Sequence, residues 1–445
     1  MTETEPTPAK AVLDAANTPG QDLERGTKTQ KPDLERENRS QANLIRQLLS
    51  SSGTMTFLAI VLALLVSALL VACFNPQVQS AAGYLFARPS DFFQAFGAAF
   101  ASFFTSLLRG AIFDYEATSV ARMVAPIFNS LTEATPLILA GLSVALAFRA
   151  GLFNIGAQGQ LLMGAMLGTW AGLSFDLPPV LHLVVAMLCA MIGGGLWGFI
   201  PGILKAKVGA NEVIVTIMLN SVAVYLLPYL LKQKSFIGQG YPGKSMQVPD
   251  SALYMPLLGS QFRFHFGFLV ALGAALFVWW LLERSTLGFE LRAAGANPAA
   301  ARTAGISVTR VITLSMVLAG VLAGLAGTAS ALGTDRFLST GIAAGVGFDA
   351  ITVALLGRSR PLGTVLAGLL FGALRAGGTA MQAAPGTHIK IVLVLQSTIV
   401  LFIAAPPLIR AIFRLPERRE PLGAASPSPA SVPAAAPAAP AAKEA

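Results

Sequence analysis

Long apolar segments alternate with short polar connections along most of the chain. The clearest segment, Thr54 to Phe74, "TMTFLAIVLALLVSALLVACF", contains no charged residue. A helix crosses a bilayer with about 20 apolar residues, and several segments approach that length. We therefore expect an all-α polytopic membrane protein with about ten transmembrane helices, some of them broken or re-entrant. The predicted spans lie near residues 54–74, 131–149, 156–175, 180–204, 213–231, 265–282, 311–333, 345–357, 361–376 and 389–407.

One apolar segment is harder to place. Residues 91–108, "DFFQAFGAAFASFFTSLL", are short and bracketed by Asp91 and Arg109. An interfacial helix is the preferred interpretation. If this segment crosses the membrane instead, the number of spans becomes odd and the termini lie on opposite sides.

The chain ends differ from the apolar centre. Residues 1–50 are polar and lack the apolar surface that folding requires, so we expect a disordered cytoplasmic tail. Residues 51–415 form the predicted transmembrane domain. Residues 416–445 are rich in Pro and Ala, which predicts a disordered or polyproline-like tail.

Composition supports the membrane class and suggests an orientation. Only 12% of the residues are charged and 54% are hydrophobic, whereas soluble domains carry about 25% charged residues. The net charge of +9 could indicate nucleic-acid binding, but Lys and Arg also gather in the cytoplasmic loops of membrane proteins. With ten spans, four basic connections share the side of the N-terminal tail, so both termini are predicted to be cytoplasmic. These connections contain Lys205 and Lys207, the loop 283–310, Arg358 and Arg360, and the run 410–419.

Residues that carry catalytic or metal chemistry are few and scattered. Cys73 and Cys189 lie far apart in apolar segments, so we interpret them as small buried side chains. His182, His265 and His388 show no metal-ligand spacing. Since no nucleophile–base pair is visible either, we expect no enzyme, no metal site and no cofactor in this chain.

Gly238 to Ser245, "GQGYPGKS", fits the phosphate-loop pattern G-x-x-x-x-G-K-[ST]. A working phosphate loop joins a buried strand to a helix whose N-terminal amides hold the phosphate. Here a membrane helix precedes the loop, Pro242 removes an amide, and no helical periodicity follows. We interpret the segment as an extracytoplasmic loop, so any ATP must be bound by another chain.

The basic loop 283–310 contains a short predicted helix. Asn297 suits the N-cap, and Pro298 suits the first helical position, where a missing amide costs nothing. The following Ala residues favour about two helical turns, and Gly305 suits the left-handed position after them. Because so short a helix is marginal alone, docking into a partner chain is favoured over a plain solvated loop.

Two groups of polar residues are candidates for lining a substrate path. Asn154, Gln158 and Gln160 bring amides to membrane depth beside glycines that interrupt the helix pattern, although a tight cytoplasmic turn explains them equally well. Thr216 and Asn220 lie inside a predicted span, where single amides most often join helices.

Further along, Asp349 lies at or just inside a predicted span, as a functional acid or as a helix N-cap, and Thr352 follows it as a candidate. The segment "GRSRPLG" at 357–363 predicts a cytoplasmic turn. Small-residue ladders predict close contact between helix backbones. The ladders are Gly164 with Gly168, Gly194 with Gly198 and Gly202, and Gly320 with Gly324.

Several separated motifs together resemble a known family. They are "AFRAGLFNIGAQGQLLMGA", "GANEVIVTIMLN", "LRAAGANPAAARTAGI", and Val353 to Arg358 followed by "PLGTVLAGLLFGALRAGG". They resemble the permease subunits of bacterial ABC importers of the branched-chain amino acid and simple-sugar class, and are most similar to nucleoside-type permeases. The resemblance covers roughly residues 50–410. The long Pro/Ala tail departs from it, as does Gln158, where many relatives are expected to have an acid.

The resemblance implies a function and a set of partners. The chain would be one of two different permease subunits in the cytoplasmic membrane of a bacterium. ATPase subunits would bind ATP and dock on the loop as a coupling helix, and an extracytoplasmic lipoprotein would deliver a nucleoside. The implied coupling residues are Ala296, Asn297, Pro298, Ala299, Ala300, Arg302, Gly305 and Ile306.

Other functions stay open at this point. The first alternative is a permease of the same class for a simple sugar or a branched-chain amino acid. An ion-coupled secondary transporter is disfavoured by the docking loop and by the scarcity of acids within the spans. An intramembrane enzyme or a signalling scaffold would lack an associated ATPase.

Overall fold

The computed structural model of the chain describes residues 52–237, 243–259 and 261–383, with isolated positions between 394 and 412. Both predicted tails lie outside these residues, as does most of the predicted span at 389–407. Residues Ala59–Ala405 form one compact unit, and the packing reported below lies within it.

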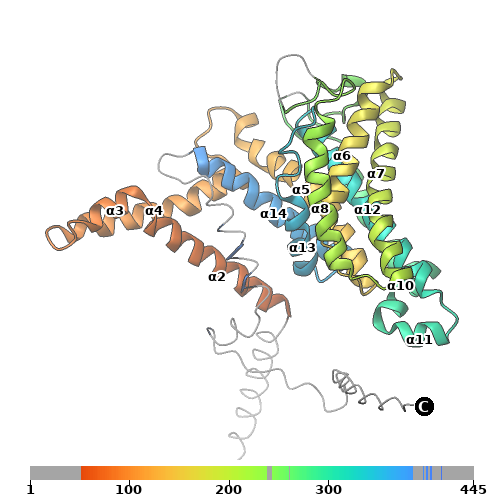
Figure 1. Cartoon of the computed structure of the whole chain (residues 1–445). Helices are drawn as coiled ribbons and strands as arrows, with labels where there is room; N and C mark the ends of the chain where they lie inside the picture. Colours follow the sequence, from red (N-terminus) through yellow and green to blue (C-terminus); the bar gives the residue numbers. More distant parts are fainter. Residues whose placement is uncertain are drawn as a thin grey trace, which may run out of the picture. The chain divides into compact units, whose positions relative to one another are not determined.

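The described part of the chain is helical and contains no strand, apart from isolated bridges (Figure 1). The helices are α2 (Ser52–Cys73), α3 (Pro76–Ala82), α4 (Pro89–Ala111), α5 (Val120–Arg149), α6 (Ala157–Ser174), α7 (Pro179–Val208), α8 (Glu212–Leu230), η1 (Asp250–Ala252), α9 (Gly267–Arg284), α10 (Thr286–Ala296), α11 (Pro298–Thr303), α12 (Val308–Thr328), the π-helix η2 (Ala329–Thr334), α13 (Val346–Leu356) and α14 (Pro361–Ala383).

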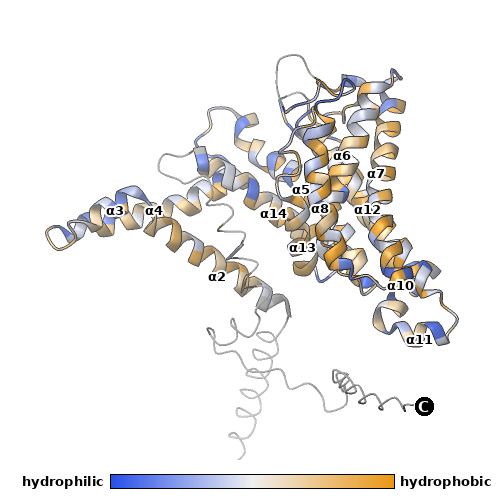
Figure 2. Cartoon of the chain, in the orientation of Figure 1, coloured by the Kyte–Doolittle hydropathy of each residue, from blue (hydrophilic) through white to orange (hydrophobic). Residues whose placement is uncertain are grey.

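Eight helical segments of the described ranges are long and apolar enough to cross a membrane. Figure 2 shows apolar residues along α7 and α8, whereas α10 and α11 are more polar. The all-α polytopic prediction is therefore confirmed. The 23-residue α4 is among the eight segments, so its composition permits a crossing and its interfacial placement stays a prediction.

Two predicted spans differ from the other helices. α6 has 18 residues but is not among the eight apolar segments. It packs against α7, α8 and α12, so it does not need an apolar surface that faces lipid. α13 has only 11 residues and rises about 16 Å, roughly half of the apolar core of a bilayer. The expectation that 345–357 forms a complete span is therefore wrong. Positive φ angles at Gly345 and Arg358 bracket the helix and limit its length.

Glycines allow the helices at the centre of the unit to touch through their backbones. A Cβ atom built on Gly194 of α7 would overlap the carbonyl oxygen of Gly320 in α12. A Cβ atom on Gly164 of α6 would overlap Gly324 in the same way. The predicted small-residue ladders therefore lie in close contacts between α6, α7 and α12. α5 packs against α9, α12, α13 and α14, and all its residues from 134 to 147 are buried.

The cap loop, residues 243–259 and 261–266, covers the C-terminal end of α12. Ser245 donates its backbone N–H to the Leu338 carbonyl at 2.8 Å, and the Leu338 N–H donates to the Ser245 hydroxyl at 2.9 Å. The Lys244 ammonium lies 4.6 Å from the centre of the Phe337 ring. Residues 243–249 contain no helix, so the described part of the phosphate-loop look-alike does not resemble a phosphate site.

His265 is buried inside this cap loop. Its ring stacks on Tyr254 with 5.4 Å between ring centres, and its Nδ1 accepts a hydrogen bond from the Gly267 N–H at 3.2 Å. Burial, followed by the charge of Arg263, lowers the pKa of His265 to about 4. The ring is therefore neutral at pH 7.

We expect the cap loop to lose stability in acid. Between about pH 6.5 and pH 4 the unfolded chain binds a proton at His265 and the folded chain does not, so the free energy of unfolding falls as the pH falls. The measurement is the apparent melting temperature of the detergent-solubilised chain across this range. His265→Asn keeps an acceptor for Gly267 and should show a weaker pH dependence. Equal pH dependence in both chains would contradict the assignment.

Candidate functional site

The helix predicted in the basic loop is present and is capped as the sequence indicates. The Asn297 side-chain oxygen accepts hydrogen bonds from the N–H groups of Ala299 at 3.0 Å and Ala300 at 3.1 Å. Pro298 is the first residue of α11, and Gly305 follows the helix with φ +83°. α11 has six residues, slightly under two turns.

Most of the surface of α11 is exposed. Ala296, Ala299, Ala300 and Arg302 are exposed, whereas Ala301 is buried and Ile306 is half-buried. The Ile306 N–H donates to the Ala301 carbonyl at 3.0 Å, which closes the turn behind the helix. The main contacts of α11 are with α10 and α12, so it is a surface helix that packs on these two helices.

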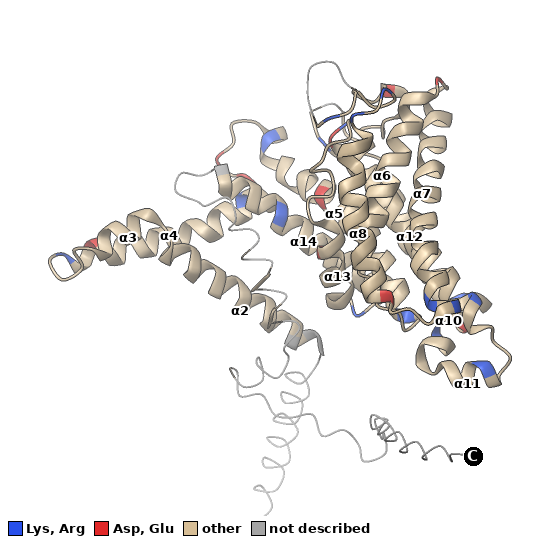
Figure 3. Ribbon diagram, in the orientation of Figure 1, with Lys and Arg blue, Asp and Glu red and all other residues tan. Residues whose placement is uncertain are grey.

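α10 connects α11 to residues 150–156, the break between α5 and α6. The backbones of Gly295 in α10 and Gly151 touch, so that a Cβ atom on Gly295 would lie 2.9 Å from the Gly151 nitrogen. The Arg149 Nε donates to the Ser359 carbonyl in the α13–α14 turn at 2.9 Å. Figure 3 shows Lys and Arg around this end of the unit. A load on α11 would therefore reach the end of α5 through packed backbone and the α13–α14 turn through the Arg149 side chain.

Buried side-chain amides stabilise this break through hydrogen bonds to its backbone. The Asn154 side chain accepts from the Gly156 N–H at 2.9 Å and donates to the Gln160 side chain at 3.0 Å. Asn220 of α8 accepts from the Gly159 N–H at 2.8 Å and donates to the Ile155 carbonyl at 2.9 Å. Asn220 thus satisfies two backbone groups that an unbroken helix would pair internally. Its side chain joins α8 to the break, and a role in lining the path stays a prediction.

Asn220→Leu should destabilise the contact between α8 and the break. The substitution removes both partners, leaves the Gly159 N–H and the Ile155 carbonyl buried, and should cost roughly 2–4 kcal/mol. We expect a lower apparent melting temperature in detergent. Ser221→Leu on the exposed side of α8 is the matched control and should change little. A melting temperature for Asn220→Leu equal to that of the control would contradict the role of the amide.

Gln158 connects the start of α6 to the start of α13. Its side-chain oxygen accepts from the Gly347 N–H at 2.9 Å, and a Cβ atom on Gly347 would overlap the Gln158 backbone. Thr216 is fully buried and donates to the Glu212 carbonyl of its own helix, and Thr352 is also buried. The structure therefore places Asn154, Gln158, Thr216 and Asn220 in or beside the break, with their side chains engaged.

Asp349 forms an ion pair that the sequence reasoning missed. Its carboxylate accepts from the Arg375 guanidinium of α14 at 2.8 Å, and the same nitrogen donates to the Ala344 carbonyl at 2.8 Å. Asp349 forms no side-chain cap for α13, so the N-cap interpretation is wrong. The signal for its partner was an arginine inside the apolar segment "GLLFGALRAGG".

Comparisons with known proteins show the family of the chain. The family described as branched-chain amino acid transport system / permease component matches residues 126–404. The guanosine ABC transporter permease NupP of Bacillus subtilis is 44% identical over 64% of this chain and 82% of its own length. A glucose ABC transporter permease of Haloferax volcanii is 39% identical, over 61% of this chain and 74% of its own length.

A third relative is the nucleoside ABC transporter permease NupB of Lactococcus lactis, which is 37% identical over 62% of this chain and 78% of its own length. No solved structure matches the chain. The family match covers more than half of the 445 residues, including the break, α11 and the Asp349–Arg375 pair. The chain is a multi-pass membrane permease that belongs to the branched-chain amino acid transport system permease family.

Proposed function

We propose that the chain is the membrane-spanning permease subunit of an ATP-binding-cassette importer that translocates nucleosides. The observation that carries the substrate is the 44% identity to a guanosine ABC transporter permease. The nucleoside permease of Lactococcus lactis supports the same class. The energy comes from ATP hydrolysis in a separate chain, for which α11 offers an exposed docking helix.

The proposed assembly contains three kinds of partner. ATPase subunits dock on residues Ala296 to Ile306, a second permease completes the path, and an extracytoplasmic lipoprotein delivers the substrate. The support for ATPase docking is local, since Asn297 and Gly305 fix both ends of a helix that packs on α10 and α12. The assembly lies in the bacterial cytoplasmic membrane with both termini cytoplasmic, as the basic connections indicate.

A sugar permease is the second candidate. A glucose ABC transporter permease is 39% identical, only slightly less than the guanosine permease. Both substrates are neutral and carry several hydroxyl groups, so the same polar side chains could serve either one.

Uptake assays separate these candidates. Labelled guanosine, uridine, glucose and leucine are supplied to cells with and without this chain, and vanadate-sensitive ATPase activity is measured in the purified assembly. We expect nucleoside uptake to require the chain and an ATPase to copurify with it. Chain-dependent glucose uptake without nucleoside uptake would establish the sugar alternative. The absence of any ATPase would overturn the importer assignment.

A further inference from the structure

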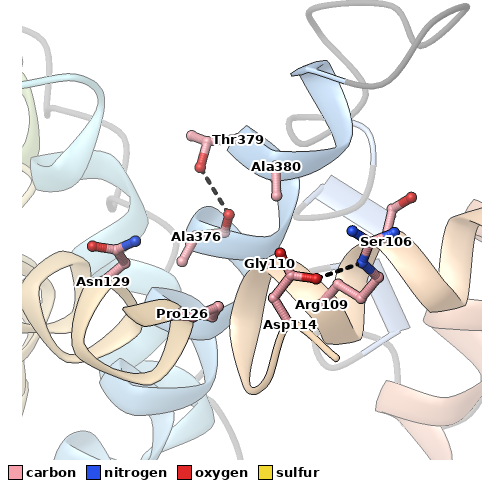
Figure 4. Close-up of a pocket in the computed structure, with 9 residues that line it drawn as sticks. All are labelled: Ser106, Arg109, Gly110, Asp114, Pro126, Asn129, Ala376, Thr379 and Ala380. Atoms are coloured by element: carbon pink, nitrogen blue, oxygen red, sulfur yellow. Dashed lines mark hydrogen bonds and ion pairs between the residues drawn. The ribbon is translucent and has the colours of Figure 1, made fainter. Parts of the chain in front are cut away.

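A polar cavity of about 520 Å³ lies between α4, α5 and α14 (Figure 4). Its lining includes Ser106 and Arg109 of α4, Asn129 of α5 and Thr379 of α14, together with Asp114 from the α4–α5 connection. The consecutive helices α4 and α5 and the distant helix α14 therefore build one opening. Its volume falls within the roughly 300–1,000 Å³ of small-molecule sites.

The cavity lies far from α11. Asn129 precedes Arg149 by 20 residues along α5, a rise of about 30 Å, and Arg149 lies at the end that contacts the α13–α14 turn. This distance equals the thickness of the apolar core of a bilayer, about 30 Å. If α11 faces the cytoplasm, the cavity therefore opens at the outer boundary of the membrane.

The cavity holds polar groups that lipid cannot satisfy. The side chains of Ser106 and Asn129 form no hydrogen bond with any described residue, and Asn129 is exposed. Apolar lipid chains offer neither donors nor acceptors, so these groups require water, a solute or a second protein. The Arg109 guanidinium pairs with Asp114 at 2.8 Å and with Glu116, so the lining has no unpaired charge among its described residues.

One helix that lines the cavity, α14, also carries the partner of a predicted path residue. Thr379 and Arg375 are four residues apart on α14, which places them on the same face of the helix, one turn apart. Arg375 in turn pairs with Asp349 of α13. The α14 face thus connects the cavity to the Asp349–Arg375 pair.

We propose that this cavity is the outer vestibule of the substrate path, and that it binds a neutral solute rich in hydrogen-bonding groups, a nucleoside. The proposal rests on the proposed function for its substrate. Ser106 and Asn129 donate and accept hydrogen bonds to the sugar hydroxyls or the base edge. The neutralised arginine explains why the site suits a neutral solute better than an amino acid, whose carboxylate and ammonium would both need partners.

The test uses the complete transporter in cells that lack other nucleoside uptake. We expect Ser106→Leu and Asn129→Leu to raise KM for guanosine at least about tenfold, the loss of roughly 1.4 kcal/mol of binding. Thr105→Leu is the matched control, since Thr105 is the exposed neighbour of Ser106 on α4 and does not line the cavity. Its KM should stay at the wild-type value.

A labelling experiment gives a readout that a structural defect would not produce. Asn129→Cys should react with a membrane-impermeant thiol reagent from outside the cell, and guanosine should slow that reaction. The wild-type chain, with Cys73 and Cys189, gives the background. Wild-type KM values in both leucine variants, with no protection by guanosine, would overturn the vestibule alone. Absence of chain-dependent guanosine uptake in the wild type would overturn the proposed function and the nucleoside assignment with it.

Discussion

Replacing residues 297–305 by a flexible Gly-Ser linker of equal length will leave a membrane-inserted chain that no longer takes up its substrate. The proposed docking role of α11 is supported by Asn297 and Gly305, which fix its two ends, and by its surface, nearly all of which is exposed. Among the membrane-spanning helices, the main contact that its removal takes away is a small one with α12. We therefore expect normal membrane insertion, loss of ATPase copurification, and uptake reduced to the background of cells without the chain.

Asn297 variants supply the control for this experiment. Asn297→Asp keeps a side-chain acceptor for the Ala299 and Ala300 N–H groups and should retain uptake. Asn297→Leu removes the cap, costs the helix about 1 kcal/mol, and should weaken coupling in part. Undiminished uptake by the linker variant would contradict the coupling role of α11.

Arg375→Met should be the most damaging single substitution within the membrane-spanning part. The side chains of Arg375 and Asp349 are only 12% and 20% exposed, so removing the arginine leaves a largely buried carboxylate without its partner. Breaking such a pair costs roughly 3–5 kcal/mol. We expect a strongly lowered apparent melting temperature in detergent and loss of uptake.

The double variant Arg375→Met, Asp349→Asn separates charge from packing. It removes both charges, so the stability should recover in large part, although the hydrogen bond from Arg375 to the Ala344 carbonyl is not restored. Recovery of stability without recovery of uptake would show that the charges themselves serve transport. A melting temperature of Arg375→Met equal to that of the wild type would contradict the importance of the pair.

Features encoded by neighbouring residues could be predicted from the sequence. α11 was predicted residue by residue, because an N-cap, a first-turn proline and a C-terminal glycine act on adjacent backbone. The membrane class followed from apolar length alone. The predicted bounds 345–357 lie within one residue of those of α13 at each end, but a helix this short does not span the membrane. The turn after it could not be predicted, since Arg358 and Ser359, which adopt positive φ, are not residues that mark a left-handed turn in a sequence.

Features that depend on contacts between distant segments could not be predicted. The sequence favoured a role for Asn220 in joining helices over one in lining a path, but only the fold brings it to the Gly159 N–H. The partner of Asp349 lies 26 residues away on another helix. The cavity combines α4, α5 and α14, and no local pattern indicates that their polar residues meet.

The glycine contacts between α6, α7 and α12 have a mechanical consequence. Backbone atoms meet there without intervening side chains, so no change of rotamer can accommodate sliding of one helix along another. These three helices must move as one stiff body. The displacement that opens and closes a path must then take place at the edges of this three-helix body. One such edge is where Asn220 of α8 is hydrogen-bonded to the break, and another is where the half-length α13 meets α14.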